Sequence, residues 1–158
     1  MRRLPTAAEL DEFHVLVVRT DHGDEPSWRT VVAELTRPWG DGGHEALVHV
    51  VDDRAWAGAD VDDVLRAAAA NEELSVVFVA DAVTMASAHH ALLAVTTVPA
   101  EEYENFEEYE GIHAFGREFR TTPAGVHDIH ANLSLGNMDF EEFAEAAHED
   151  LEKVYRAV

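Results

Sequence analysis

Four aspartates follow apolar runs of this 158-residue chain, each where a predicted strand ends. They are Asp21, Asp52, Asp53 and Asp81. The carboxyl ends of parallel strands meet at one edge of a sheet, and ligands of such sheets bind there. Carboxylate oxygens suit Mg²⁺, so one interpretation is a metal site for phosphoryl chemistry. The other is that each aspartate caps a helix or a turn.

Other residue types with reactive side chains give weaker patterns. His127 and His130 are three residues apart on a predicted helix, which can place two imidazoles on one face, but no third ligand follows at a familiar spacing. A pair of this kind beside Asp128 is typical of a solvated face. There is no cysteine, no Gly-rich phosphate loop and no serine in a GxSxG context. We therefore predict no cofactor and favour a protein that is not an enzyme.

The segment EEYENFEEYE combines glutamates with regularly spaced aromatic residues. Its members of these two kinds are Glu101, Glu102, Tyr103, Glu104, Phe106, Glu107, Glu108, Tyr109 and Glu110. One interpretation is a short helix that buries its aromatic side. The other is an anionic ridge with aromatic anchors that binds a basic protein.

The charge of the whole chain is strongly negative. The formal net charge is −21, with 32 acidic residues against 11 Lys and Arg. This balance argues against binding nucleic acid or anionic lipid, because both need clustered cations. No apolar h-region or membrane-length apolar run is present, which predicts a cytoplasmic protein. Solvation and salt adaptation remain alternative causes of the acidity, and a GC-rich genome is an alternative cause of the excess of arginine over lysine.

Apolar periodicity predicts alternating strands and helices. Continuous apolar runs predict buried strands at 13–19, 46–51, 74–80 and 91–98, and alternation predicts an edge strand near 114–121. Helical spacing predicts helices after Asp24, after Asp60, after Thr122, and from Phe140 through Leu151 to Val154. Residues 81–87 are predicted as a turn or one short helix.

These elements predict a single α/β domain over residues 1–158, with an acidic insert at about 100–111. Strands that alternate with helices favour right-handed crossovers in a parallel sheet. We expect a doubly wound, mainly parallel five-stranded sheet in the order 2-1-3-4-5, with helices on both faces.

Several blocks of the chain resemble a family of uncharacterised small acidic proteins, mostly actinobacterial. The most specific is NLSLGNMDFEEFAEA at 132–146, and LVVRTD at 16–21, VHVVDDRAWAG at 48–58 and VFVAD at 77–81 are also similar. The acidic insert has no counterpart in that resemblance. The resemblance implies a stand-alone domain of unknown function, so no catalytic residue is carried over.

The sequence thus favours a non-enzymatic interaction protein. It would bind and neutralise a basic partner, as an immunity protein does for a toxin or nuclease. The alternatives are the Mg²⁺-dependent enzyme, or a small-molecule sensor or self-associating scaffold, including a homodimer. In the last case Trp39, Trp56 and Tyr103 would line a pocket or a symmetric contact.

Overall fold

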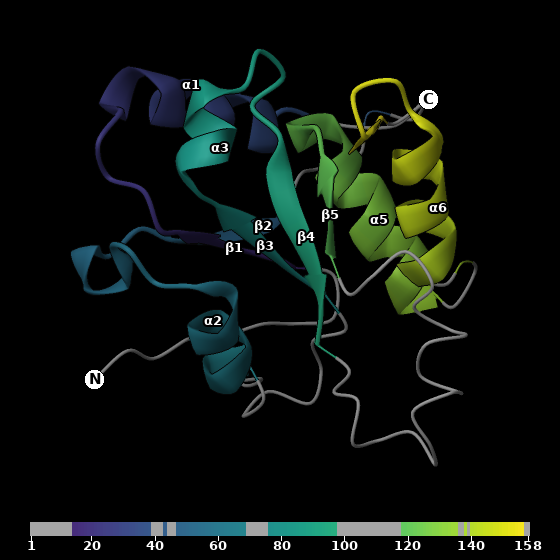
Figure 1. Ribbon diagram of the computed structural model, residues 1–158, viewed down its shortest axis with the longest axis horizontal. Helices are drawn as coiled ribbons and strands as arrows, with labels where there is room; N and C mark the ends of the chain where they lie inside the picture. The colour runs from purple at the N-terminus through teal and green to yellow at the C-terminus, as the bar shows by residue number, and fades with distance from the viewer. Residues whose placement is uncertain are drawn as a thin grey trace.

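The structure of the protein is a computed structural model that describes residues 14–38, 43, 47–68, 76–97, 118–135, 138 and 140–156. It shows an α/β fold in which helices pack against a mixed sheet (Figure 1). The strands are β1 Val15–Arg19, β2 Val48–Val51, β3 Val76–Ala80, β4 Leu92–Thr96, β5 Glu118–Thr121 and β6 Val154–Tyr155. The helices are α1 Glu25–Leu35, the 3₁₀ helix η1 Arg54–Trp56, α2 Val61–Ala68, α3 Ala82–Ala86, α5 Pro123–Leu135 and α6 Phe140–Glu149. The predicted acidic insert, and with it Glu101 to Glu110, lies outside the described residues.

The sheet has the order β2-β1-β3-β4-β5-β6. The predicted α/β class and the predicted order of the first five strands are confirmed. β1 pairs in parallel with β2 and with β3, whereas β4 is antiparallel to both of its neighbours. β6 pairs in parallel with β5. The sheet is therefore mixed and six-stranded, and β5 lies inside it rather than at its edge as predicted.

The direction of β4 follows from the short connection that precedes it. The link between β3 and β4 contains a single five-residue helix, α3. A parallel return usually needs a crossover of about a dozen residues or more, so a link this short favours the antiparallel return that is observed. His90 takes a left-handed conformation, with φ of 49°, in the turn before β4.

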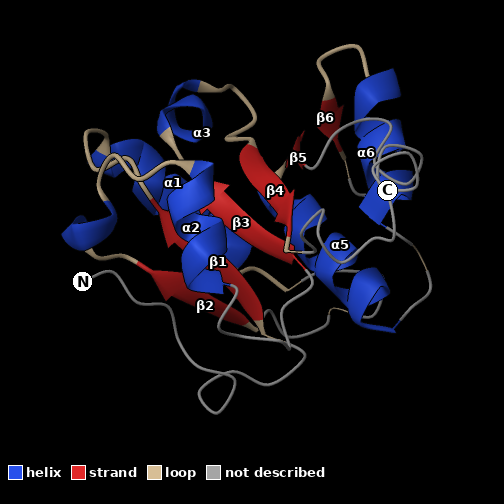
Figure 2. Ribbon diagram, turned by 60° about the horizontal axis from the view of Figure 1, so that its bottom comes forward, coloured by secondary structure: helices blue, strands red, loops and turns tan. Residues whose placement is uncertain are grey.

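Side chains of the central strands are buried on both faces of the sheet. Val15 and Val17 of β1 face a core shared with α1, α3, α5 and α6. Leu16 and Val18 face a second core that α2 and Trp56 cover. Figures 1 and 2 show α2 on the opposite side of the sheet from α1 and α3. Helices thus cover both faces, as predicted, and the continuous apolar runs reflect this double burial.

The C-terminal segment departs from its predicted helical structure. α6 ends at Glu149, Leu151 is fully exposed, and Val154 belongs to β6. The Asp150 carboxylate accepts hydrogen bonds from the backbone N–H groups of Glu152 and Val154, at 2.9 and 3.4 Å. These bonds stabilise a tight turn that redirects the chain along β5, because an aspartate competes with the helix for backbone donors.

Within the described part of the chain, no helix is both long and apolar enough to cross a bilayer.

Candidate functional site

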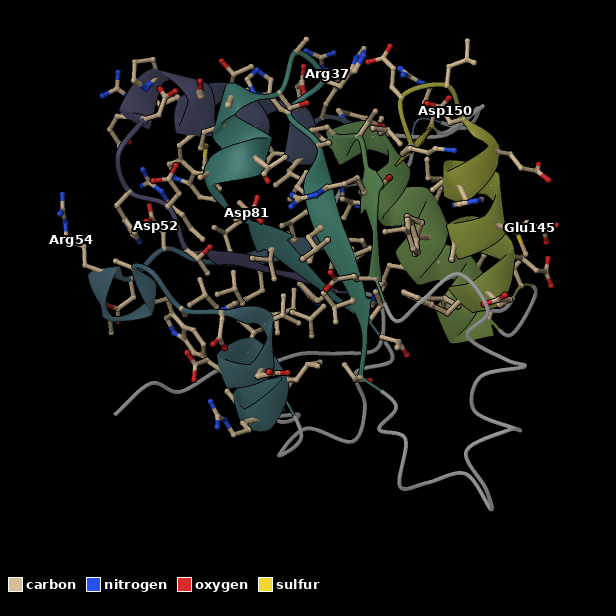
Figure 3. All side chains as sticks on the ribbon, in the orientation of Figure 1. Arg37, Asp52, Arg54, Asp81, Glu145 and Asp150 are labelled. Atoms are coloured by element: carbon tan, nitrogen blue, oxygen red, sulfur yellow. The ribbon has the colours of Figure 1, made fainter. Side chains whose placement is uncertain are left out.

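The carboxylates predicted to share a sheet edge do lie at one edge, where β1, β2 and β3 end (Figure 3). Two of them serve local structure. Asp53 caps η1 by accepting from the backbone N–H of Ala55 at 2.9 Å. Asp21 accepts from the backbone N–H of Gly23 at 3.0 Å. The interpretation as turn and capping residues is therefore confirmed for Asp21 and Asp53.

Asp81 is held by a neighbouring strand as well as by its own helix. Its carboxylate accepts two hydrogen bonds from the Arg120 guanidinium, at 2.8 and 2.9 Å. It also caps α3, accepting from the backbone N–H of Thr84 at 3.1 Å. Burial alone would raise the pKa of Asp81, but the hydrogen bonds and charge of Arg120, with those from Thr84, outweigh it and lower that pKa. The ion pair between Asp81 and Arg120 therefore links the end of β3 to β5.

Asp52 belongs to a second ion cluster on the same edge and contacts both Arg19 and Trp28 there. One of its oxygens lies 3.2 Å from Arg19 Nη1, and the other accepts from the Trp28 indole at 3.2 Å. Its side chain is 45% exposed. Over the described residues, no group of three or more His, Asp and Glu side chains is arranged to hold a metal ion. The four aspartates are thus engaged by protein donors.

Arg19 lies at the centre of this second cluster and is almost completely buried, with 2% of its side chain exposed. Nη1 also lies 2.9 Å from the Glu25 carboxylate, and Nε donates to the Asp21 carbonyl at 2.9 Å. Its guanidinium carbon lies 4.9 Å from the centre of the Trp28 ring, a cation–π contact. Nη2 has no hydrogen-bond partner among the residues that the structure describes. Arg19 therefore joins the ends of β1 and β2 to the start of α1.

His22 packs against the same cluster and is largely buried. Its Nδ1 lies 3.8 Å from the Asp52 oxygen that Arg19 also contacts, and 9% of its side chain is exposed. Its Nε2 is buried and has no hydrogen-bond partner within the described ranges. The sequence alone did not single out His22, because nothing but its position after Asp21 marks it. A charged residue that ends an apolar strand, as Arg19 does, was the only available signal for the cluster.

A cleft of about 550 Å³ opens at this edge, beside β1 and β3. Its lining residues are Thr20, Asp21, His22, Gly23, Arg54, Ala57, Gly58, Ala59, Asp81 and Ala82. α1 and α2 pack on opposite faces of the sheet. The connections therefore diverge between β1 and β3, and ligands of open α/β sheets bind at this type of switch point. This cleft is the candidate ligand site of the fold.

The histidine pair on α5 is buried, so its interpretation as a solvated face was wrong. His127 and His130 are 3% and 5% exposed. His127 Nε2 lies 2.7 Å from the Leu35 carbonyl oxygen at the end of α1 and donates to it. Burial lowers the pKa of His127, and the bond to Leu35 opposes this only in part. The pair joins α5 to the core.

The aromatic residues of the scaffold alternative do not form one surface among the described residues. Trp56 is 1% exposed and packs in the core beneath α2. Trp39 and Tyr103 lie outside the described residues. Trp56 is therefore a core residue and is not exposed for a symmetric contact, while the scaffold alternative itself stays untested.

Acidic side chains also gather on the outer face of α6. Glu142, Glu145 and Glu149 are exposed and recur at helical spacing, so they share one face. Figure 3 shows Glu145 pointing outward from this helix. Several cations of the fold are already paired with carboxylates of the same chain: Arg19, Arg66, Arg120 and Arg156. The α6 face, defined by its three glutamates, adds to the surplus of negative charge at the surface.

No curated protein matches this sequence. Residues 14–158 match the family described as Domain of unknown function (DUF6924), which covers every described element of the fold. The predicted membership of a family without a known function is therefore confirmed. The chain belongs to the DUF6924 family.

Proposed function

We propose that this protein binds a basic protein partner in the cytoplasm and neutralises it, as an immunity protein neutralises a toxin or nuclease. The observation that carries the proposal is the net charge of −21. A protein with a large negative charge attracts a basic partner over long distances, which raises the rate of encounter.

The ion pairs within the fold support this proposal. Arg19 and Arg120 are held at the sheet edge, and Arg156 lies 3.1 Å from Asp150 beside β6. Cations in such positions neutralise carboxylates of the chain itself. The exposed glutamates of the α6 face add to the negative field of the surface.

The proposed contact residues are the glutamates and aromatics of residues 101–110. Aromatic anchors between charged groups are typical of tight interfaces, where a few desolvated side chains carry most of the binding free energy. The charges set the rate of association, and the aromatic residues set the lifetime of the complex.

The test measures how fast this protein associates with a basic protein encoded by an adjoining gene. That basic protein is the probe. We expect the association rate to fall at least about tenfold between 50 and 500 mM NaCl, because salt screens the steering field. Replacing all six glutamates of residues 101–110 by glutamine should lower the rate and weaken the complex. An unrelated basic protein such as cytochrome c controls for general attraction to an acidic surface.

A matched variant carries Glu142→Gln, Glu145→Gln and Glu149→Gln on the α6 face. It removes three negative charges, half as many as the variant of residues 101–110, and it removes them from a different part of the surface. A loss caused only by the net charge would therefore appear in both variants, whereas a loss of contact would appear only in the variant of residues 101–110. An association rate that does not change with salt would contradict the proposal. So would a complex that keeps its lifetime after the six replacements.

A further inference from the structure

We propose that the C-terminal segment 150–156 is a pH-sensitive strap, which closes more tightly on the sheet when His89 is protonated. The strap consists of the turn after α6, strand β6 and Arg156. It is a different region from residues 101–110, and the inference does not depend on the protein partner.

The strap joins the sheet through a very short strand. β6 has two residues, Val154 and Tyr155. They pair with Arg120 and Thr121 of β5. The Tyr155 carbonyl accepts from the Thr121 hydroxyl at 3.1 Å and from the backbone N–H of Thr122 at 3.2 Å. A two-residue strand at the end of a sheet can open while the longer central strands stay paired.

The side chain of Tyr155 holds one end of the strap by contacts that do not respond to pH in the neutral range. Its hydroxyl donates to the Asp128 carboxylate, and its ring packs edge-on against Phe143 with 5.0 Å between the ring centres. Burial and the neighbouring Asp128 carboxylate raise the pKa of Tyr155 above its ordinary value, so the phenol stays protonated. The pH sensitivity must therefore come from the other end of the strap.

Ion pairs hold that other end, the turn after α6, to the connection between α3 and β4. Both segments lie at the top of Figure 1. His89 belongs to the α3–β4 connection, and its Nε2 lies 2.9 Å from one Glu152 carboxylate oxygen. The other Glu152 oxygen lies 3.3 Å from Arg156 Nη2, and Arg156 Nε lies 3.1 Å from Asp150. His89 is the member of this cluster that comes from outside the strap.

The charges of this cluster balance when His89 is protonated, because two carboxylates, Asp150 and Glu152, otherwise face one arginine. Among the described residues, the charged side chains in contact with His89 are Glu152 and Arg156, whose Nη2 lies 3.5 Å from the imidazole Nε2. Protonation gives His89 a charge-assisted bond to Glu152. The nearer carboxylate outweighs the repulsion from Arg156, since Asp150 already neutralises that guanidinium.

Neighbouring titratable and charged groups make their own contacts. His90 Nδ1 lies 3.3 Å from the Thr84 carbonyl oxygen, within the turn that precedes β4. The Lys153 ammonium donates to the His148 carbonyl at the end of α6. The side chains of His148 and Glu149 are exposed in the last turn of that helix. The strap therefore contacts the α3–β4 connection through the pair of His89 with Glu152.

Histidine changes its charge between pH 5 and 8, so the closed strap should be more stable at acidic pH and loosen as the pH rises. Opening would leave β5 at the edge of the described sheet. His127 has the opposite effect on the whole fold, because burial lowers its pKa and its protonation destabilises the core. The two histidines can thus be told apart by the direction of the pH dependence.

The test is amide hydrogen exchange of the full-length, ¹⁵N-labelled protein at pH 5.5 and 7.5, followed by NMR and corrected for intrinsic exchange rates. The Thr122 amide, which donates to Tyr155, reports closure of the strap, and the Phe78 amide in β3 reports unfolding of the centre of the sheet. We expect the Thr122 protection factor to be the lower of the two. His89 and Glu152 are 33% and 60% exposed, so we expect that factor to be only about threefold higher at pH 5.5 than at pH 7.5.

His89→Gln and His49→Gln form a matched pair. Glutamine at position 89 keeps an N–H donor for Glu152 but does not titrate, so the pH dependence of Thr122 should fall below about 1.5-fold. His49 lies in β2, at the opposite end of the sheet, and its replacement should leave the threefold difference unchanged. Arg156→Gln should lower the Thr122 protection factor at both pH values.

Three results would overturn the proposal. The first is a Thr122 amide that exchanges as slowly as Phe78, because the strap would then open only when the whole sheet unfolds. The second is a Thr122 protection factor that is equal at the two pH values or higher at pH 7.5. The third is a full pH dependence of Thr122 in His89→Gln.

Discussion

Arg19 determines the chemistry of the sheet edge, although the side chains that hold it are much more exposed than Arg19 itself. Glu25 and Asp52 are 51% and 45% exposed, whereas Arg19 is 2% exposed. Removing a buried charge relieves its desolvation cost, but removing its partner leaves the buried charge less compensated. The two changes should therefore have unequal effects on stability.

We predict that Asp52→Ala lowers the free energy of unfolding by about 3 kcal/mol, while Arg19→Met lowers it by only about 1 kcal/mol. The first change leaves Arg19 Nη1 with Glu25 alone and removes the acceptor of the Trp28 indole. Urea unfolding at pH 7.5 measures both values. Asp53→Ala, which removes only a cap, is the control and should cost about 1 kcal/mol. A larger loss in Arg19→Met than in Asp52→Ala would contradict this account.

His127 links stability to pH. Its pKa is lowered in the folded protein by burial, so the unfolded chain binds more protons between that pKa and the ordinary value of about 6.5. Stability contributed by neutral His127 is therefore complete above about pH 6.5 and is lost as the pH falls.

We predict that the wild-type protein loses about 1 kcal/mol more than His127→Gln when the pH falls from 7.5 to 5.5. Glutamine can donate to the Leu35 carbonyl but does not titrate in this range. Urea unfolding of both proteins at the two pH values gives the difference, and the other histidines contribute equally to both. Parallel losses in the two proteins would assign the pH dependence to other groups.

At the scale of elements, α5 packs closely against the strands beside it. A Cβ atom at Gly125 would lie 2.2 Å from Thr121 Oγ1 and 3.2 Å from a Tyr155 ring carbon. Thr121 is completely buried, and its hydroxyl donates to the Tyr155 carbonyl at 3.1 Å. Gly125 thus allows the first turn of α5 to approach both β5 and β6.

We predict that Gly125→Ala destabilises the protein by about 2 kcal/mol, because overpacking outweighs the roughly 1 kcal/mol that alanine gains in a helix. Thermal or urea unfolding measures the change. Thr121→Ala removes the oxygen that the new methyl group would meet. Combined with Gly125→Ala, it should cost less than the sum of the two single changes, and strict additivity would argue against the clash.

The elements that the sequence predicted well are those whose surroundings are uniform. β1 and β3 are buried on both faces, and this produced the continuous apolar runs. β6 could not be predicted, because it has two residues and Val154 also continues the helical spacing of α6. The direction of β4 depends on the short connection that precedes it, and the apolar pattern of the strand does not encode that direction.

For the candidate site, the sequence predicted which carboxylates share an edge of the sheet, but it did not predict their partners. Strand ends placed Asp21, Asp52 and Asp81 at one edge, and this is confirmed. The partners of Asp52 are Arg19 of β1 and Trp28 of α1. The register of the sheet decides which side chains meet, and the sequence pattern does not give that register. These two partners could therefore not be assigned to Asp52 in advance. Residues 101–110 lie outside the described residues, and their role stays a prediction.

At the scale of the whole molecule, the net charge of −21 acts on the folded state itself. Like charges repel one another in the compact state, and this repulsion is screened by salt. The ion pairs of Arg19 and Arg120 are partly or fully buried and are screened less. Salt should therefore relieve the repulsion more than it weakens these pairs.

We predict that the melting temperature of the isolated protein rises by several degrees, about 3–8 °C, between 20 and 300 mM NaCl. Differential scanning calorimetry at pH 7.5 measures the shift. The triple glutamine variant of the α6 face brings the formal charge from −21 to −18 and should show a smaller rise. A melting temperature that falls as salt is added would mean that the internal ion pairs dominate.

The short link between β3 and β4 has a consequence for the order in which the chain folds. These two central strands pair across a single small helix, so little chain entropy is lost when they meet. β1 reaches β3 from far away in the sequence, as the pairing of Val17 with Phe78 shows. The antiparallel hairpin is therefore expected to form early, with the parallel strands added afterwards. A cleft that needs both β1 and β3 is then among the last features of the molecule to be assembled.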